Sequence, residues 1–192
     1  MRYKFSLVRY NVPYRMAFSD PRKNVGHLEL REGMRVADFG AGSGHYATAL
    51  SRLVHDSGRV YAIDLQKELL RRIKNLSRTE HAGNIEVIWG DIEQVGGSKL
   101  PQNSMDAVVM SNMLFQVEHR RAAVEEAKRV LKQGGKVLVI DWADSFGGLG
   151  PRPEDVVKPE SAQALFKDLG FSTVKEFSDA GDHHYGFVFK KS

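Results

Sequence analysis

The chain has 192 residues, of which 42% are hydrophobic and 27% are charged. These are ordinary values for a globular protein, so they argue against disorder and fibre formation, and the length suits one domain. The longest apolar runs, such as VLVI at 137–140, are far too short to span a membrane. The complete absence of cysteine excludes disulfides, thiolate chemistry and thiolate metal sites.

The net charge of +4 is concentrated at the start of the chain, because residues 1–35 hold eight basic and three acidic residues. Five aromatic residues are interleaved with these charges: Tyr3, Phe5, Tyr10, Tyr14 and Phe18. The mixture suits an anionic substrate, an RNA surface or anionic lipid headgroups, and equally a solvated lid whose arginines lie on its own surface. Cations interrupt the apolar centre that a signal peptide needs, so we expect a cytoplasmic protein.

Strand and helix patterns alternate along the rest of the chain. Strands are predicted at 34–40, 59–64, 84–91, 105–112 and 136–142, and helices at 45–55, 65–76, 120–132 and 159–170, with Gly134 and Gly135 ending the third helix. Two final strands, FSTVKEF and HYGFVFKK, have no helix between them and should pair antiparallel. We predict a doubly wound α/β fold with a mostly parallel seven-stranded sheet, in which one strand is antiparallel. Residues 1–33 would form a cap on the domain at 34–192.

The stretch VADFGAGSGHYA at 36–47 places glycines at every second position between a strand and a helix. Glycines there allow positive φ and let a ligand approach the backbone, while the helix start offers free N–H groups. A dinucleotide fingerprint, G-x-G-x-x-G, would need glycine at position 45 if it began at Gly40, and His45 stands there. Starting at Gly42 fails as well.

The spacing that is present resembles motif I of the class I S-adenosylmethionine-dependent methyltransferases. Further matches follow in order over residues 34–142, at the ends of the predicted second to fifth strands. The resemblance implies S-adenosylmethionine as cofactor and assigns its binding to Asp38, Gly40, Gly42, Gly44, Asp64, Leu65, Asp91, Ile92, Ser111 and Asn112. In the family, the acid at Asp64 accepts hydrogen bonds from the ribose hydroxyls and the acid at Asp91 accepts from the adenine amine. Ribose hydroxyls and amines are donors, for which carboxylates are natural acceptors.

Each acid also has an interpretation that involves no ligand: Asp38 and Asp91 could stabilise turns, and Asp64 could be a solvated strand end. Three carboxylates at successive strand ends on one rim would nevertheless be an improbable coincidence.

Catalytic candidates are His183, His184 and Asp141, which the predicted topology brings to the same rim as the cofactor. Strand alternation would allow only one histidine to face the cleft. His183 alternates with Tyr185 and Phe187, an apolar set suited to burial, so His184 is the expected substrate-facing base. The competing interpretation is that neither histidine is functional. No metal site is expected, because adjacent strand residues point to opposite faces.

The acceptor is a small molecule on this interpretation, since the pattern looks most like the branch that includes quinone-biosynthesis methyltransferases. SNML at 111–114 lacks the proline-aromatic tetrapeptide of DNA amino-methyltransferases, and the absence of thiols excludes cysteine-dependent base or arsenic methylation. RNA methylation is the rival activity, favoured by the basic N-terminus but without an added RNA-binding domain. The alternative that is not an enzyme is a protein that binds the cofactor without catalysis and acts in interaction or regulation. A lid formed by residues 1–30 over the acceptor is expected to be required for turnover.

Overall fold

A seven-stranded sheet forms the centre of the molecule, as shown by a computed structural model that describes residues 19–146, 148 and 150–192. Its strand order is β3-β2-β1-β4-β5-β7-β6. The strands are β1 (Arg35–Phe39), β2 (Arg59–Asp64), β3 (Ile85–Trp89), β4 (Met105–Ser111), β5 (Leu131–Trp142), β6 (Phe171–Phe177) and β7 (His184–Lys191). Six run parallel, and β7 is antiparallel to both of its neighbours, β5 and β6. The predicted fold class is confirmed.

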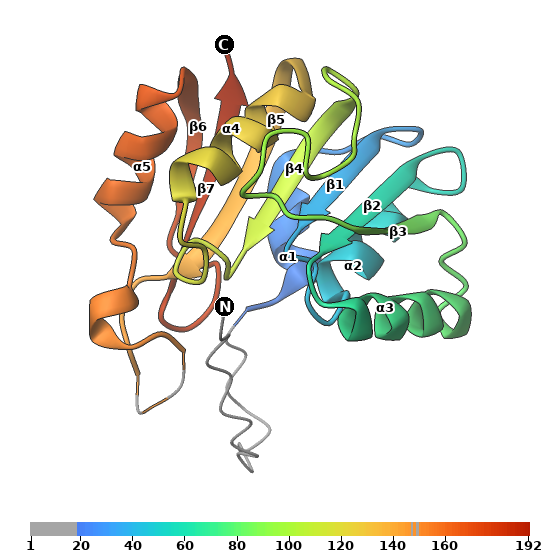
Figure 1. Cartoon of the computed structure of the whole chain (residues 1–192), viewed down its shortest axis with the longest axis horizontal. Helices are drawn as coiled ribbons and strands as arrows, with labels where there is room; N and C mark the ends of the chain where they lie inside the picture. Colours follow the sequence, from blue (N-terminus) through green and yellow to red (C-terminus); the bar gives the residue numbers. More distant parts are fainter. Residues whose placement is uncertain (1–18, 147, 149) are drawn as a thin grey trace.

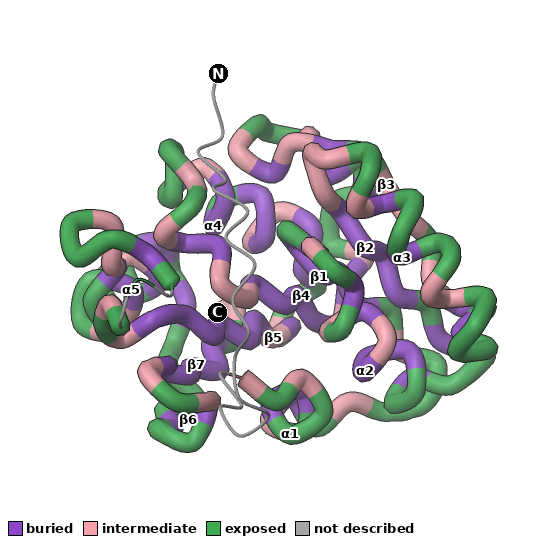
Figure 2. Tube along the Cα trace, turned by 90° about the horizontal axis from the view of Figure 1, so that it is seen from below, coloured by how far each residue is buried: buried purple, intermediate pink, exposed green. Residues whose placement is uncertain are grey.

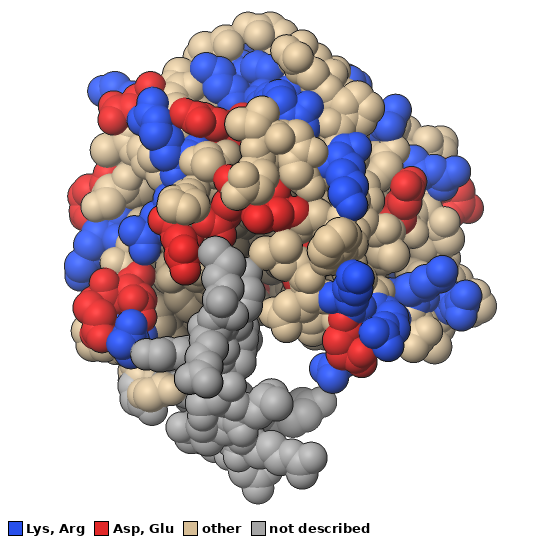
Figure 3. All heavy atoms as spheres, in the orientation of Figure 1, with Lys and Arg blue, Asp and Glu red and all other residues tan. Residues whose placement is uncertain are grey.

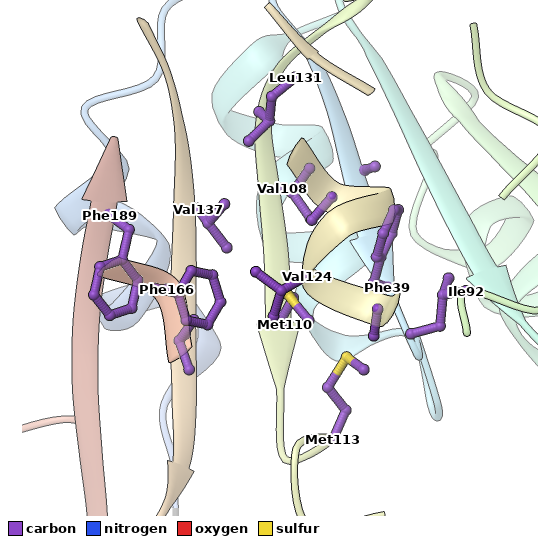
Figure 4. Packing of buried hydrophobic residues seen from close by; sticks show 14 of the residues in the cluster. Phe39, Ile92, Val108, Met110, Met113, Val124, Leu131, Val137, Phe166 and Phe189 are labelled. Carbon is purple, nitrogen blue, oxygen red and sulfur yellow. The ribbon is translucent and has the colours of Figure 1, made fainter. Parts of the chain in front are cut away.

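Helices cover both faces of the sheet (Figures 1 and 2). They are α1 (Pro21–Val25), α2 (His45–Val54), α3 (Lys67–Thr79), α4 (Arg120–Val130) and α5 (Pro159–Asp168), with short 3-10 turns at Gly26–Leu28 and Pro153–Asp155. One buried cluster joins α4 and α5 to the sheet, and a second joins α1, α2 and α3 to its other face. In the first, the ring of Phe166 in α5 stacks on that of Phe189 in β7, with centroids 4.3 Å apart (Figure 4).

The end of α4 differs from the prediction. The helix ends at Val130 rather than at Gly134 and Gly135, because Leu131 turns to extended backbone and pairs with Met105 of β4. Strand β5 therefore begins five residues before the expected position 136. The pairing of Leu131 with β4 therefore determines where the helix ends, and the two glycines do not.

Residues 19–33, the described part of the expected cap, pack against the sheet's second face. Val25 and Leu28 belong to the buried cluster there. The Asn24 side-chain amide donates to the carbonyl of Ala180 at 2.8 Å and to the Tyr46 hydroxyl at 3.0 Å. Residues 1–18, which carry most of the expected lid, lie outside the described residues.

The order of the strands reverses between β1 and β4. From β1 the sheet grows through β2 and β3 on one side, and through β4 and β5 on the other. Loops leaving the carboxyl ends of β1 and β4 therefore diverge and leave a crevice, which is where ligands bind in open α/β sheets. Among the described residues, no helix is long and apolar enough to cross a membrane.

Candidate cofactor and acceptor site

A cavity of about 330 Å³ opens at the carboxyl ends of β1, β2 and β3, beside the loop that follows β4. Six of the predicted cofactor residues line it: Gly40, Gly42, Asp64, Leu65, Asp91 and Ile92. The sequence did not point to Leu69, Met113, Gln116 or Val117, which also line it. These four are apolar or amide side chains on a helix and a loop, and no local pattern sets them apart.

The glycine loop adopts the backbone that its sequence requires. Gly40, Gly42 and Gly44 all have positive φ, at 68°, 53° and 83°. Gly44 has a second constraint, because a Cβ there would lie 2.8 Å from Cγ1 of Ile73 in α3. The residue thus begins α2 and lets α3 pack closely, while Gly40 and Gly42 form the cavity wall.

Asp64 is held by two backbone amides. One carboxylate oxygen accepts from the Gly42 N–H at 3.0 Å, and the other accepts from the Gln66 N–H at 2.8 Å. A carboxylate can accept about four hydrogen bonds, so each oxygen keeps one free acceptor position. Asp64 therefore ties the glycine loop to the end of β2 and retains capacity for a ligand's donors.

Asp91 and its neighbours form the opposite wall of the cavity. One Asp91 carboxylate oxygen accepts from the Glu93 N–H at 3.0 Å, which matches the turn-stabilising interpretation without using the second oxygen. Trp89, half-exposed at the end of β3, donates its indole N–H to the Leu65 carbonyl at 3.0 Å. This bond links the ends of β2 and β3 on either side of the cavity.

Asp38 lies beneath the glycine loop and is 2% exposed. Burial raises the pKa of its carboxyl to about 8, although a backbone hydrogen bond from Ala47 opposes the rise. Its Oδ2 is buried without a hydrogen-bond partner among the described residues. The carboxyl is therefore poised to be neutral near pH 7 unless a positive charge comes close.

Ser111 and Asn112 lie where β4 ends, outside the residues that line the cavity. Asn112 has a positive φ of 51° and donates its N–H to the Ile140 carbonyl at 2.8 Å. Its side-chain Oδ1 is buried without a partner in the described part of the chain. An unsatisfied acceptor at this rim is suited to a ligand donor.

Asp141 is fully buried at the end of β5. Its carboxylate accepts from the N–H groups of Leu114 and Trp142, each at 2.8 Å, and burial raises its pKa to about 6. The bond from Leu114 fastens the loop after β4 to the end of β5. The structure thus gives Asp141 a supporting contact, and its proposed catalytic role remains a prediction.

The two histidines have exposures opposite to those expected. The residue His184 is 5% exposed, and its ring packs on Trp142 with centroids 4.3 Å apart. The His183 side chain is 27% exposed and pairs with Asp144, the Nδ1–Oδ1 distance being 2.7 Å. Strand β7 starts only at His184, and His183 has a left-handed φ of 62°, so strand alternation does not extend to it. Tyr185, Phe187 and Phe189 are buried together as predicted.

Alternate glycines, carboxylates at successive strand ends and a cavity at the switch point define an α/β protein with a site for a nucleotide-like ligand. The methyltransferase domain family matches residues 37–139, more than half of the chain. The chain therefore belongs to this family, which confirms the resemblance seen in the sequence.

Individual relatives agree with this assignment. The chain is 36% identical over 116 residues to the ubiquinone/menaquinone biosynthesis C-methyltransferase UbiE of Pseudomonas putida, and 34% identical over 122 residues to UbiE of Pseudomonas fluorescens. These matches cover 59% and 62% of this chain but only 44% and 46% of the relatives, so the chain spans about half of their length. The crystal structure of a SAM-dependent methyltransferase from Aquifex aeolicus is similar over 95% of both chains, with 28% identity and a TM-score of 0.83.

Proposed function

We propose that the protein transfers the methyl group of S-adenosylmethionine to a small aromatic acceptor of the hydroquinone type. The observation that carries this proposal is the cavity at the switch point, which the glycine loop after β1, Asp64 at the end of β2 and Asp91 after β3 line together. Membership of the methyltransferase family and the similarity to a SAM-dependent methyltransferase support the choice of cofactor.

The residues present fit this cofactor. Asp64 has free acceptor positions for two ribose hydroxyls, and Asp91 has an uncommitted oxygen for the adenine amine. Ile92 and Leu65 supply apolar contacts to the ring. The unsatisfied oxygens of Asp38 and Asn112 lie toward β1 and β4, where the positively charged methionine end would extend. A cation there would favour the ionised form of Asp38.

The cofactor supplies an electrophile that its own sulfonium charge activates. The protein must therefore mainly position the acceptor in line with the methyl group and exclude water. Gly40 and Gly42 allow close approach along the cavity wall, and Gly44 fixes the start of α2. Asp141 holds the loop after β4, which carries the lining residues Met113 and Gln116.

The acceptor class rests on the relatives, which are named as C-methyltransferases of ubiquinone and menaquinone biosynthesis. Because the chain spans about half of their length, the acceptor belongs to the proposal and not to the family assignment. A cytoplasmic location is likewise part of this proposal, and immunoblotting of cell fractions checks it.

Incubation of the full chain with methyl-tritiated S-adenosylmethionine tests this function. The acceptors to compare are a 2-alkyl-1,4-dihydroxynaphthalene kept reduced, a bulk RNA preparation, and no acceptor. We expect label in the naphthalene product alone. Label in RNA alone would establish the rival activity, and cofactor binding without transfer to any acceptor would favour a non-catalytic binding protein.

A further inference from the structure

We propose that His183, oriented by Asp144, is the base that removes the hydroxyl proton of the acceptor. The inference rests on the proposed function and deepens it, because it restricts the acceptor to molecules that must lose such a proton. It also moves the expected base from His184 to its neighbour.

Hydrogen bonds connect the turn at His183 to the loop beside the cofactor cavity. Met113 lines the cavity, and the N–H of the next residue, Leu114, donates to Asp141 at the end of β5. Two residues further, the Ala143 N–H donates to the His183 carbonyl at 2.7 Å. The end of β4, the end of β5 and the turn before β7 are therefore joined side by side along one rim.

The distance along this rim suits an aromatic acceptor. Adenosine would occupy the ends of β2 and β3, so the methyl group would lie toward β4 with the acceptor beyond it. Neighbouring strands lie about 4.8 Å apart, which places β7 about 10 Å from β4 across β5. A methyl group followed by a ring system spans this gap.

Asp144 determines which nitrogen of the ring is available. An ionised carboxylate only accepts hydrogen bonds, so the Nδ1 of His183, 2.7 Å from Asp144 Oδ1, must carry a proton. The Nε2 then holds the lone pair in the neutral ring, and no side chain or backbone group of the described residues hydrogen-bonds to it. Phe146 stacks on the same ring with centroids 4.1 Å apart and an interplanar angle of 22°, which fixes its plane.

His184 lacks these properties. Its Nδ1 lies 2.6 Å from the Asp182 carbonyl, its Nε2 is buried, and burial lowers its pKa. The ring packs on Trp142 and is closed off from the surface. The side chain is part of the support beneath the rim.

His183 Nε2 takes the proton of an aromatic hydroxyl while the adjacent ring carbon forms a bond to the methyl carbon and the methyl–sulfur bond breaks, leaving neutral S-adenosylhomocysteine. The ring carbon then loses its own proton to water, and the electron pair of that C–H bond restores the aromatic ring and leaves a phenolate oxygen. His183 returns its proton to this oxygen, so the methylated hydroquinone and the neutral histidine are formed. Neither an oxidant nor a reductant is needed.

The test compares His183→Gln with wild type on the reduced 2-alkyl-1,4-dihydroxynaphthalene between pH 6 and 10. At pH 7 we expect kcat to fall about 100-fold, which is the usual size of a general-base contribution. Cofactor affinity should be unchanged. The deficit should shrink as pH approaches the acidity of the hydroxyl, near 10 for a phenol, because the acceptor then ionises in solution. Asp144 pairs with His183, and Asp182 and His184 are its neighbours along the chain, so variants of these three groups need the same pH series.

Asp144 is a positioning residue on this account. Asp144→Ala should lower kcat, and Asp144→Asn, which keeps an oxygen to accept from Nδ1, should restore part of the loss. His81→Gln, at an exposed histidine beyond α3, is the matched control and should behave as wild type.

Two outcomes would contradict the inference and remain distinguishable. Wild-type turnover with an equally active His183→Gln variant, or a deficit that is constant from pH 6 to 10, would overturn the role of His183 alone. Cofactor binding without wild-type turnover of the hydroquinone would overturn the proposed acceptor, and this inference with it.

Discussion

At the residue scale, the site depends on acidic side chains whose environments differ sharply. Asp64 is half-buried and bonded to two amides, whereas Asp38 is buried with one oxygen unsatisfied. The first is suited to accept hydrogen bonds from a neutral diol, and the second is suited to respond to a nearby positive charge. Each environment leads to a separate prediction.

Replacing Asp64 with alanine should weaken S-adenosylhomocysteine binding by about 2–4 kcal/mol, or roughly 30- to 1,000-fold, because two ribose hydroxyls lose their acceptor. Titration calorimetry of the variant and wild type measures this change. Asp56→Ala, at an exposed aspartate near the opposite end of β2, is the matched control. Wild-type affinity in Asp64→Ala would remove this carboxylate from the site.

The raised pKa of Asp38 predicts a pH dependence of stability. Since its pKa rises from 3.8 unfolded to about 8 folded, the native state holds more protons in between, and the free energy of unfolding falls as pH rises through this window. Burial lowers the pKa values of His27 and His184 from 6.5. Their ionisation therefore makes the free energy of unfolding rise with pH, but only below about pH 6.5. Urea unfolding at pH 7 and 8 should therefore show a decline in the wild type that Asp38→Asn abolishes. An equal decline in both proteins would place the ionisation elsewhere.

The sequence predicts the places of Asp38, Asp64 and Asp91 in the fold, because each acid stands at or just beyond the end of an apolar run: Asp38 and Asp64 lie at the ends of β1 and β2, and Asp91 lies two residues after β3. It does not predict the pairing of His183 with Asp144, which lie 39 residues apart, nor the left-handed backbone at His183 that takes it out of the strand pattern. The supporting bond from Leu114 to Asp141 spans 27 residues and is equally hidden. Such contacts depend on how the loops meet after the sheet has formed.

At the element scale, the joint between the glycine loop, α2 and α3 positions the cavity wall. Gly44 is the N-cap of α2 in a left-handed conformation, and Ile73 of α3 packs directly over it. The same short segment therefore sets the backbone around the ligand and the spacing of two helices. A side chain at Gly44 would disturb both.

We expect Gly44→Ala to lower the free energy of unfolding by about 2–4 kcal/mol, of which about 1–2 kcal/mol is the left-handed backbone cost and the rest the contact with Ile73. Gly96→Ala shares a positive φ, at 75°, but has open space around its Cβ and should lose only the backbone part. Urea denaturation measures both. The cost of Gly44→Ala should shrink in an Ile73→Ala background, and full additivity would contradict the steric account.

At the scale of the whole molecule, the excess positive charge is confined to one end of the sequence. Residues 1–18 contain four basic and no acidic residues, and they account for the entire net charge of +4. The remaining basic and acidic side chains are interspersed over the face shown in Figure 3, and in α3 Glu68 pairs with Arg71 and Arg72. The hydroxyl of Ser19 lies 2.8 Å from that of Tyr46 at the start of α2, so the N-terminal segment joins the fold close to the glycine loop.

We propose that residues 1–18, with their five aromatic side chains, cover the acceptor. Deleting them should preserve cofactor affinity and abolish methyl transfer, because aromatic rings can enclose an apolar acceptor and exclude water. The deletion should stop at Phe18, since Asp20 caps α1 and Asn24 is buried in the fold. Calorimetry and the tritium assay measure the two effects. A truncated protein with full activity would show that the segment is dispensable.

The central claim is that the cavity at the ends of β1, β2 and β3 is the S-adenosylmethionine site, and amide hydrogen exchange with and without S-adenosylhomocysteine tests it most directly. The account predicts ligand-dependent protection within residues 40–43, 63–66, 90–93 and 113–117, which contain the cavity lining apart from Leu69, and none with NAD. Protection confined instead to residues 28–31 and 132–136, which line a second cavity at the other end of the sheet, would contradict it, as would protection by NAD.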